Sequence, residues 1–259
     1  MATESTVIAP GAGVALVTLF DIDGKLLTDR TAEFARGVCD AGAASVLVAG
    51  TAGEFWLLSD DERVALVQSV RRAISEVPIF AHVGGLAIDR AVPLTKRMID
   101  AGASAILALP VGVDDLFSYY GAIVDAAAGT PVLAYHLPRL GTPVPVEDLR
   151  ALGVSAIKDS SGDSNRLAQE ILSIGFETYT GAPPLLGVAN QFGGAGSITG
   201  VANVRPEWSA QAWAGDQKAL VDVTKLGIQT SQSFPTELKR AVAARWSVPL
   251  FSRVGTLTG

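Results

Sequence analysis

The stretch Val154-Ser155-Ala156-Ile157-Lys158-Asp159-Ser160-Ser161-Gly162 decides how the rest of the chain is interpreted. Its short apolar run has the length of a buried strand, and it ends in a lysine followed by turn residues. A lysine at that place keeps its stem among apolar neighbours, and burial disfavours its charged form relative to the nucleophilic amine. On this stretch alone, a lysine that reaches solvent or pairs with Asp159 is the simpler interpretation. The chain on either side must decide between the two.

Short apolar runs alternate with helical patterns along nearly the whole chain. The runs are continuous rather than alternately polar, which is typical of parallel strands that are covered on both faces. Eight such units, spaced roughly 20–35 residues apart, predict an α/β fold, a closed (β/α)8 TIM barrel. The strands are expected at residues 14–20, 45–48, 78–83, 105–109, 131–135, 155–158, 176–179 and 196–198. Helices are expected at residues 28–41, 59–76, up to about 101, 114–128, 146–152, 164–173, 183–192, after Pro206, and twice within 217–248.

The domain boundaries follow from the same pattern. We expect a barrel domain over residues 1–210, whose first 13 residues form a loosely docked arm, and a short C-terminal helical extension over 211–259 packed on the barrel. Residues 40–45 are echoed at 100–105, and each copy ends a helix with a glycine before the next strand. A doubly wound open sheet is the alternative, but no glycine-rich dinucleotide fingerprint follows the first strand.

Composition restricts the class of protein. The 259 residues are 49% hydrophobic and 18% charged, which suits a large core and excludes disorder. A net charge of -6 argues against nucleic acid and anionic membranes as partners. The sequence shows no leader and no membrane-spanning run, and its one cysteine, Cys39, allows no internal disulfide. We therefore expect a cytoplasmic protein.

The strand ends bring chemically useful side chains together, because active sites of such barrels lie at the C-terminal ends of the strands. Thr51 follows the second strand, Tyr135 and His136 end the fifth, and Lys158 ends the sixth. The amine could attack a carbonyl while the phenol and the hydroxyl shuttle protons. The turn amides of residues 51–53 could bind a carboxylate. Thr51 could instead cap a turn and Tyr135 could be a rim aromatic, but their joint placement favours catalysis.

Three motifs carry a family resemblance: Gly50-Thr51-Ala52-Gly53-Glu54, Tyr135-His136-Leu137-Pro138 and residues 157–162. They resemble, in the same order, motifs of the dihydrodipicolinate synthase / N-acetylneuraminate lyase family of class I aldolases. Gly193-Gly194-Ala195-Gly196-Ser197-Ile198 is similar to that family's segment around strand eight. The resemblance covers about residues 14–210. It implies a lyase that makes or breaks a carbon–carbon bond of pyruvate or a related 2-keto acid, with no cofactor or metal beyond the covalent Schiff base, and a homo-oligomer (dimer or tetramer).

The resemblance also implies roles for individual residues. Lys158 would form the Schiff base, Tyr135 would transfer protons, and Thr51 would relay protons and hold the carboxylate. The residues expected to contact substrate are Ala52, Gly53, Gly84, His136, Arg139 and Ile198.

Several positions depart from the family pattern. Ala52 stands where a second hydroxyl residue is usual, and His136 where an asparagine is usual. In the synthase branch an arginine grips the aldehyde substrate. Leu140 stands at the position of that arginine in this chain, and Arg139 comes one position before it. The tyrosines expected just after strand four are absent, since Tyr119 and Tyr120 fall later, on a helix.

These departures leave several functions open. The run Val83-Gly84-Gly85-Leu86 is similar to 2-keto-3-deoxy-sugar-acid aldolases, which is the preferred assignment. A 4-hydroxy-tetrahydrodipicolinate synthase and a catalytically impaired keto-acid-binding paralogue are the alternatives. A metal-dependent aldolase is disfavoured, because the only histidines, His82 and His136, lack metal-ligand spacing around them.

Overall fold

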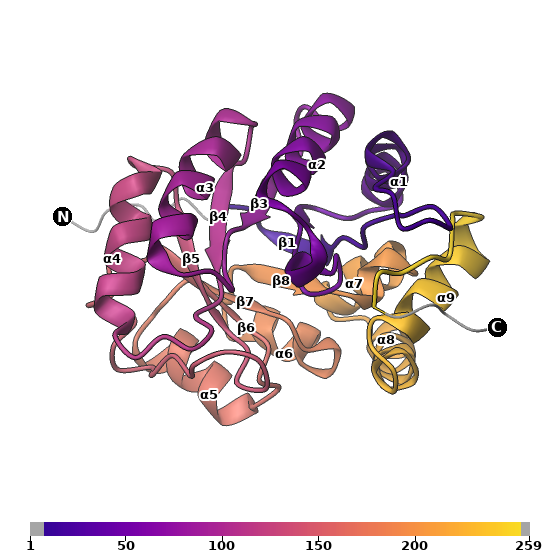
Figure 1. The fold of residues 1–259 in the computed structure, drawn as a ribbon. Coiled ribbons are helices and arrows are strands. Elements are labelled where there is room, and N and C mark those ends of the chain that lie inside the picture. The colour runs from indigo at the N-terminus through magenta and orange to yellow at the C-terminus, as the bar shows by residue number, and fades with distance from the viewer. Residues whose placement is uncertain (1–7, 255–259) are drawn as a thin grey trace.

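Eight apolar runs pair in parallel, each with its neighbour in the chain, in the computed structural model, which describes residues 8–254. The last strand pairs with the first, so the sheet closes into a barrel (Figure 1). The predicted TIM barrel is confirmed. Its strands are β1 (Gly11–Ala15), β2 (Val46–Val48), β3 (Ile79–His82), β4 (Ala105–Ala108), β5 (Val132–His136), β6 (Ala156–Asp159), β7 (Thr178–Thr180) and β8 (Gly196–Thr199).

Helices follow every strand except β5 and cover the outside of the barrel (Figure 1). The α-helices are α1 (Thr28–Asp40), α2 (Asp60–Ala73), α3 (Ile88–Asp100), α4 (Leu116–Ala127), α5 (Ser164–Ala168), α6 (Leu186–Gln191), α7 (Pro206–Trp213), α8 (Gln217–Ser231) and α9 (Thr236–Trp246). Helix α2 begins with a capping box: the Ser59 hydroxyl accepts from the Glu62 amide, and the Glu62 carboxylate accepts from the Ser59 amide. The two helices expected in the tail are α8 and α9, which pack on each other beside α7.

The first strand differs from the prediction. It begins at Gly11 and ends at Ala15, whereas the apolar run pointed to residues 14–20. Glycines are poor strand formers, but a Cβ at Gly13 would lie 2.2 Å from Ser45 Oγ, so the close approach of β1 to the β2 segment requires glycine there. The Leu16 amide still donates to the Leu47 carbonyl of β2 over 3.0 Å. Beyond it, side chains take over as acceptors: Val17 donates to Asn203 Oδ1 over 2.9 Å, and Leu19 donates to Thr31 Oγ1 over 3.1 Å.

Three other segments differ as well. Residues 146–152 form successive turns rather than a helix. The expected helix over 164–173 is α-helical only to Ala168 and continues as the π-helical turn Gln169–Ser173. Of the expected N-terminal arm, residues 11–13 belong to β1, and residues 1–7 lie outside the described part of the chain.

The strand register places the candidate site. Tyr135 on β5 is the direct partner of Lys158 on β6, so both side chains lie on the same face of the sheet. The next residues, His136 and Asp159, are also paired and lie on the opposite face. Both strands end at this level, so the phenol and the amine meet at the C-terminal end of the barrel.

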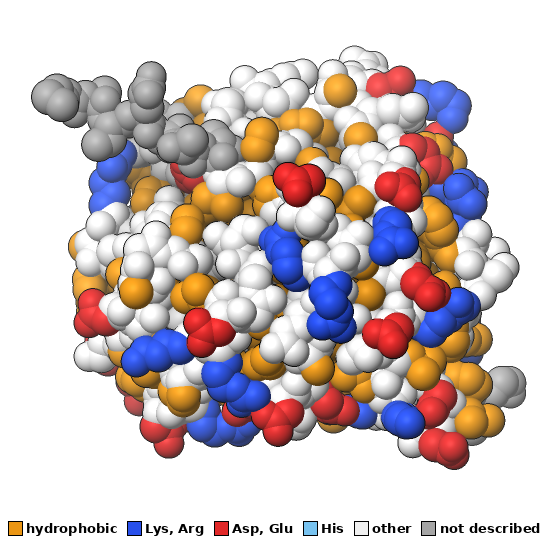
Figure 2. All heavy atoms as spheres, turned by 90° about the horizontal axis from the view of Figure 1, so that it is seen from above, with side chains coloured by type: hydrophobic (Ala, Val, Ile, Leu, Met, Phe, Trp, Pro, Cys, Tyr) orange, Lys and Arg blue, Asp and Glu red, His pale blue; other side chains and the backbone are white. Residues whose placement is uncertain are grey.

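The outer surface shows no block of one charge on the face drawn in Figure 2, where basic and acidic side chains are intermixed with apolar ones. Among the helices of residues 8–254, none has the length and apolar character needed to cross a bilayer.

Candidate active site

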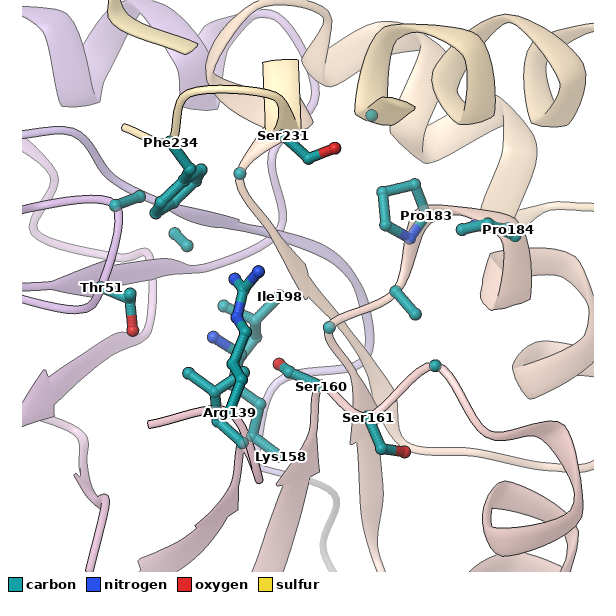
Figure 3. A pocket seen from close by; sticks show the side chains of 18 of the residues that line it. Thr51, Arg139, Lys158, Ser160, Ser161, Pro183, Pro184, Ile198, Ser231 and Phe234 are labelled. Atoms are coloured by element: carbon teal, nitrogen blue, oxygen red, sulfur yellow. The ribbon is translucent and has the colours of Figure 1, made fainter. Parts of the chain in front are cut away.

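A cavity of about 380 Å³ opens at the C-terminal end of the barrel (Figure 3). Lys158 lies at its floor, and α8 together with Phe234 closes the opposite side. Its size falls in the range of small-molecule sites, and its wall is largely apolar with a few polar groups. The lining residues are Ala15, Thr51, Ala52, Tyr135, Leu137, Arg139, Lys158, Ser160, Ser161, Gly162, Gly181, Ala182, Pro183, Pro184, Ile198, Gly200, Thr224, Gly227, Ile228, Ser231 and Phe234.

The three residues predicted to be catalytic meet in this cavity. Tyr135 Oη lies 3.4 Å from Lys158 Nζ and 3.4 Å from Thr51 Oγ1. Lys158 Nζ also lies 4.4 Å from the centre of the Tyr135 ring. All three side chains are buried, with residue exposures of 3% for Lys158 and Tyr135 and 7% for Thr51. They form a continuous path along which a proton can pass between an amine, a phenol and an alcohol.

The electrostatic environment prepares the phenol for proton transfer. Burial by itself raises the pKa of Tyr135. The positive charge of Lys158 and hydrogen bonds from neighbouring hydroxyls oppose burial, and together they lower the pKa of this phenol below its ordinary value. A more acidic phenol gives up and regains its proton more easily near neutral pH.

The turn that carries Thr51 is tightly closed. The Gly53 amide donates to the Gly50 carbonyl over 3.0 Å, and Thr18 Oγ1 donates to the Gly53 carbonyl over 2.8 Å. Gly53, which was expected to contact substrate, therefore uses its polar groups within the fold and does not line the cavity. Ala52 does line the cavity, beside Thr51.

Arg139 supplies a second positive charge. Figure 3 shows its side chain rising from above Lys158 toward the middle of the cavity. Its guanidinium carbon lies 5.8 Å from the centre of the Phe234 ring. No Asp or Glu of the described chain lines the cavity, so Lys158 and Arg139 make it a site for anionic molecules. Ile198, also predicted to contact substrate, is part of the apolar wall.

His136 and Gly84 were expected to contact substrate, but neither lines the cavity. His136 Nδ1 accepts a hydrogen bond of 3.1 Å from the Val144 amide, on the other face of β5. Burial, and to a lesser degree the charge of Arg166, lower the pKa of His136 to about 4, so the ring is neutral at physiological pH. A Cβ at Gly84 would lie 2.1 Å from the Leu109 amide nitrogen, so this glycine allows strand packing rather than giving room to a ligand.

The tyrosines of α4 do not replace the missing residues after strand four. Tyr119 and Tyr120 are fully buried, and their hydroxyls donate to the carbonyls of Leu109 (3.2 Å) and Ala108 (3.1 Å). Burial raises the pKa of both phenols well above the ordinary value, which makes them poor proton donors. These two side chains instead hold the end of β4.

The histidines do not form a metal site. Among the described residues, no three His, Cys, Asp or Glu side chains lie close enough to hold a metal ion. His82 is fully buried and stacks edge-on against Phe55, with ring centres 4.5 Å apart. Burial and the charges of Arg63 and Lys158 lower its pKa well below the ordinary value.

Two groups of lining residues were not predicted from the sequence. Ser160 follows Lys158 closely in the chain, and its hydroxyl contributes to the hydrogen bonding of Tyr135. A Cβ at Gly181 would lie 1.9 Å from Ser160 Oγ, so the glycine makes room for it. No motif marks the second group, because only the folding of α8 over the barrel brings it to the site. Its members are Thr224, Gly227, Ile228 and Ser231.

Comparison with known proteins gives consistent matches. The model of the dihydrodipicolinate synthetase family matches residues 9–233. A 4-hydroxy-tetrahydrodipicolinate synthase 2 of Streptomyces coelicolor is 34% identical over 242 residues, covering 85% of this chain and 79% of the relative. An uncharacterized DapA-like lyase of Halobacterium salinarum is 34% identical over 220 residues, covering 77% and 72%.

Solved structures share the fold. Dihydrodipicolinate synthase DapA-2 of Bacillus anthracis superposes with a TM-score of 0.87 at 24% identity, covering 95% of this chain and 91% of its own. N-acetylneuraminate lyase of Fusobacterium nucleatum, solved in complex with pyruvate, gives a TM-score of 0.81 at 20% identity, covering 95% and 90%.

Proposed function

Because this chain belongs to the dihydrodipicolinate synthetase family, we propose that Lys158 forms a Schiff base with pyruvate or a related 2-keto acid. The family consists of class I aldolase-type lyases, which use such a lysine and no separate cofactor. The observation that carries the assignment is the placement of Lys158 Nζ and Thr51 Oγ1, each 3.4 Å from the Tyr135 hydroxyl, in one buried cavity.

The chemistry follows from these positions. Once Lys158 has given up its proton, its amine attacks the C2 carbonyl of the keto acid, and the carbonyl oxygen leaves as water after accepting protons through Tyr135. Removal of a proton from C3 converts the imine into an enamine. The enamine carbon attacks an aldehyde, whose oxygen takes up a proton, and water then hydrolyses the imine to release the product and the free amine. The reverse sequence cleaves the same carbon–carbon bond.

Binding of the keto acid is assigned to the Thr51 turn. The amides of Gly53 and Glu54 already donate to the carbonyls of Gly50 and Thr51. The amides of Thr51 and Ala52, with the Thr51 hydroxyl, are therefore proposed to hold the carboxylate. Ala52 removes one hydroxyl from this arrangement, so we expect weaker binding of pyruvate than a second hydroxyl would give.

The second partner is proposed to be anionic as well, a short aldehyde or a fragment of a 2-keto-3-deoxy sugar acid. Arg139 provides the charge, and Ser160 and Ser231 provide hydroxyls around the space above Lys158 (Figure 3). The synthase activity named for the Streptomyces coelicolor relative is the second candidate, because Arg139 reaches the cavity despite its shifted position. A cytoplasmic location and a homo-oligomer stay predictions.

Exchange of the pyruvate methyl protons in D2O tests the proposal without knowledge of the aldehyde. Each cycle of enamine formation and reprotonation places deuterium on C3, and proton NMR follows the loss of the methyl signal. We expect exchange with the wild type and none above background with Lys158→Ala. Pyruvate binding without exchange would instead support the impaired paralogue.

Two assays identify the second substrate. One measures release of pyruvate from a panel of 2-keto-3-deoxy acids, and the other measures condensation of pyruvate with aspartate semialdehyde. Arg139→Met is expected to lower kcat/KM for the correct anionic partner by about 10–100-fold, the usual effect of losing a charged hydrogen bond. An unchanged kcat/KM would remove Arg139 from the site.

A further inference from the structure

The segment after α9, residues 247–254, lies across two loops at the cavity end of the barrel, and we call it the C-terminal strap (Figure 1). Phe251 forms an antiparallel bridge with Phe20, in the segment after β1. The Arg253 side chain donates to the Gly24 carbonyl over 2.7 Å and to the Leu57 carbonyl over 2.9 Å. The strap therefore ties the loop after β1 to the loop after β2, which is the loop that carries Thr51.

A buried carboxylate is the centre of this contact. Glu54 is 0% exposed, and its side chain forms an ion pair with Lys239 of α9, which is 2% exposed. The other Glu54 oxygen accepts from the amides of Arg253 (2.9 Å) and Val254 (3.3 Å). Lys239 in turn donates to the Phe251 carbonyl over 3.0 Å. One side chain thus joins the β2 loop, α9 and the strap.

Charge is balanced within this network. Arg253 also forms a two-pronged ion pair with Glu62 at the start of α2, with distances of 2.9 and 2.6 Å. Two carboxylates face two cations, so each buried charge has a partner. Removing Lys239 leaves the Glu54 carboxylate buried without its cation, and moving the loop toward water is one way in which the fold can relieve this.

Such a movement would reach Thr51. Glu54 has a φ of 59°, in the left-handed region that is unfavourable for a side chain other than glycine. Its amide donates to the Thr51 carbonyl over 3.2 Å, so the two residues belong to one turn. The contact between Thr51 Oγ1 and Tyr135 Oη, at 3.4 Å, is already at the long end for a hydrogen bond, and a small displacement breaks it.

We propose that Glu54 is a positioning residue: anchored by Lys239 and the C-terminal strap, it keeps the Thr51 hydroxyl against Tyr135. The proposal rests on the Schiff-base function above. It assigns a role in catalysis to α9 and the strap, which themselves do not line the cavity.

A double-mutant cycle on pyruvate methyl exchange tests it. We expect Lys239→Met to lower kcat/KM for exchange by about 10-fold, in keeping with the large rate effect of small misplacements. Thr51→Val removes the hydroxyl itself. If Lys239 acts through Thr51, then Lys239→Met costs less than about twofold in the Thr51→Val background. The same factor in both backgrounds would overturn the proposal.

Arg71→Met is the matched control for Lys239→Met, because it also removes a cation that donates several hydrogen bonds within the fold. Arg71 donates to the carbonyls of Gly102 (3.0 Å) and Ser75 (2.7 Å) and does not line the cavity. The substitution should leave exchange within about twofold of the wild type even if it lowers stability.

Arg253→Met covers the case in which Lys239→Met fails to fold. It keeps the Glu54–Lys239 pair but frees the strap from Gly24, Leu57 and Glu62, and the same non-additivity with Thr51→Val is expected. Additive effects would overturn the proposal while leaving the Schiff base in place. Absence of exchange in the wild type would overturn the proposed function itself.

Discussion

Replacing Tyr135 by phenylalanine removes a single oxygen at the centre of the site. The ring remains, so packing against Lys158 at 4.4 Å is kept. Two hydrogen bonds of 3.4 Å, to Lys158 and Thr51, are lost. At about 0.5–1.5 kcal/mol for each net bond, we expect the free energy of unfolding to fall by about 1–3 kcal/mol. The loss of a positioned acid–base group should slow pyruvate methyl exchange by about 10²–10⁴-fold.

Tyr119→Phe is the matched control. It deletes the same atom from a fully buried tyrosine, whose hydroxyl donates to the Leu109 carbonyl over 3.2 Å outside the cavity. Its stability should fall by a similar amount, about 1 kcal/mol, with exchange little changed. Thermal unfolding and proton NMR in D2O provide both measurements. If Tyr135→Phe slowed exchange by no more than Tyr119→Phe, Tyr135 would not be the proton carrier.

Three further outcomes follow from individual contacts. Gly181→Ala would place a Cβ 1.9 Å from Ser160 Oγ and displace that hydroxyl. We expect pyruvate methyl exchange to slow by about 10-fold, while the far-UV circular dichroism spectrum stays unchanged. His136 should titrate in NMR spectra near pH 4. Because this pKa lies below the ordinary value of 6.5, the contribution of the neutral ring to stability is lost as the pH falls from 6.5 to 4. Titration at the ordinary pKa would contradict the role of His136 as a buried acceptor. Gly121 lies within α4, where an added Cβ would meet no atom of another element within 4 Å. It should accept alanine with a gain of about 0.5–1 kcal/mol in denaturant unfolding, whereas a loss would indicate a contact made by the glycine backbone.

The barrel could be predicted because its strands are covered on both faces and therefore appear as continuous apolar runs. The first strand was misplaced for the converse reason. Gly11 and Gly13 have no side chain to signal a strand, and the apolar residues after Ala15 are buried under loops rather than paired in the sheet. The turns over 146–152 show that an apolar pattern near a buried surface does not by itself require a helix.

The candidate site was predictable only where it coincides with strand ends. Lys158 and Tyr135 follow directly from the register of β5 and β6, and Thr51 lies in the turn after β2, within reach of Tyr135. The orientation of His136 away from the cavity follows from the two-residue alternation of β5, so strand geometry could have indicated it. The α8 wall and the Glu54 network depend on contacts between residues far apart in the chain, and no local pattern encodes those.

Reduction of an enzyme–pyruvate mixture with borohydride tests the proposed imine most directly, because it fixes the imine as a stable amine. We predict a single added mass corresponding to reduced pyruvate, located on Lys158 by peptide mapping and absent from Lys158→Ala. An unmodified wild-type chain, or the same addition on another lysine such as Lys239, would contradict the assignment of Lys158.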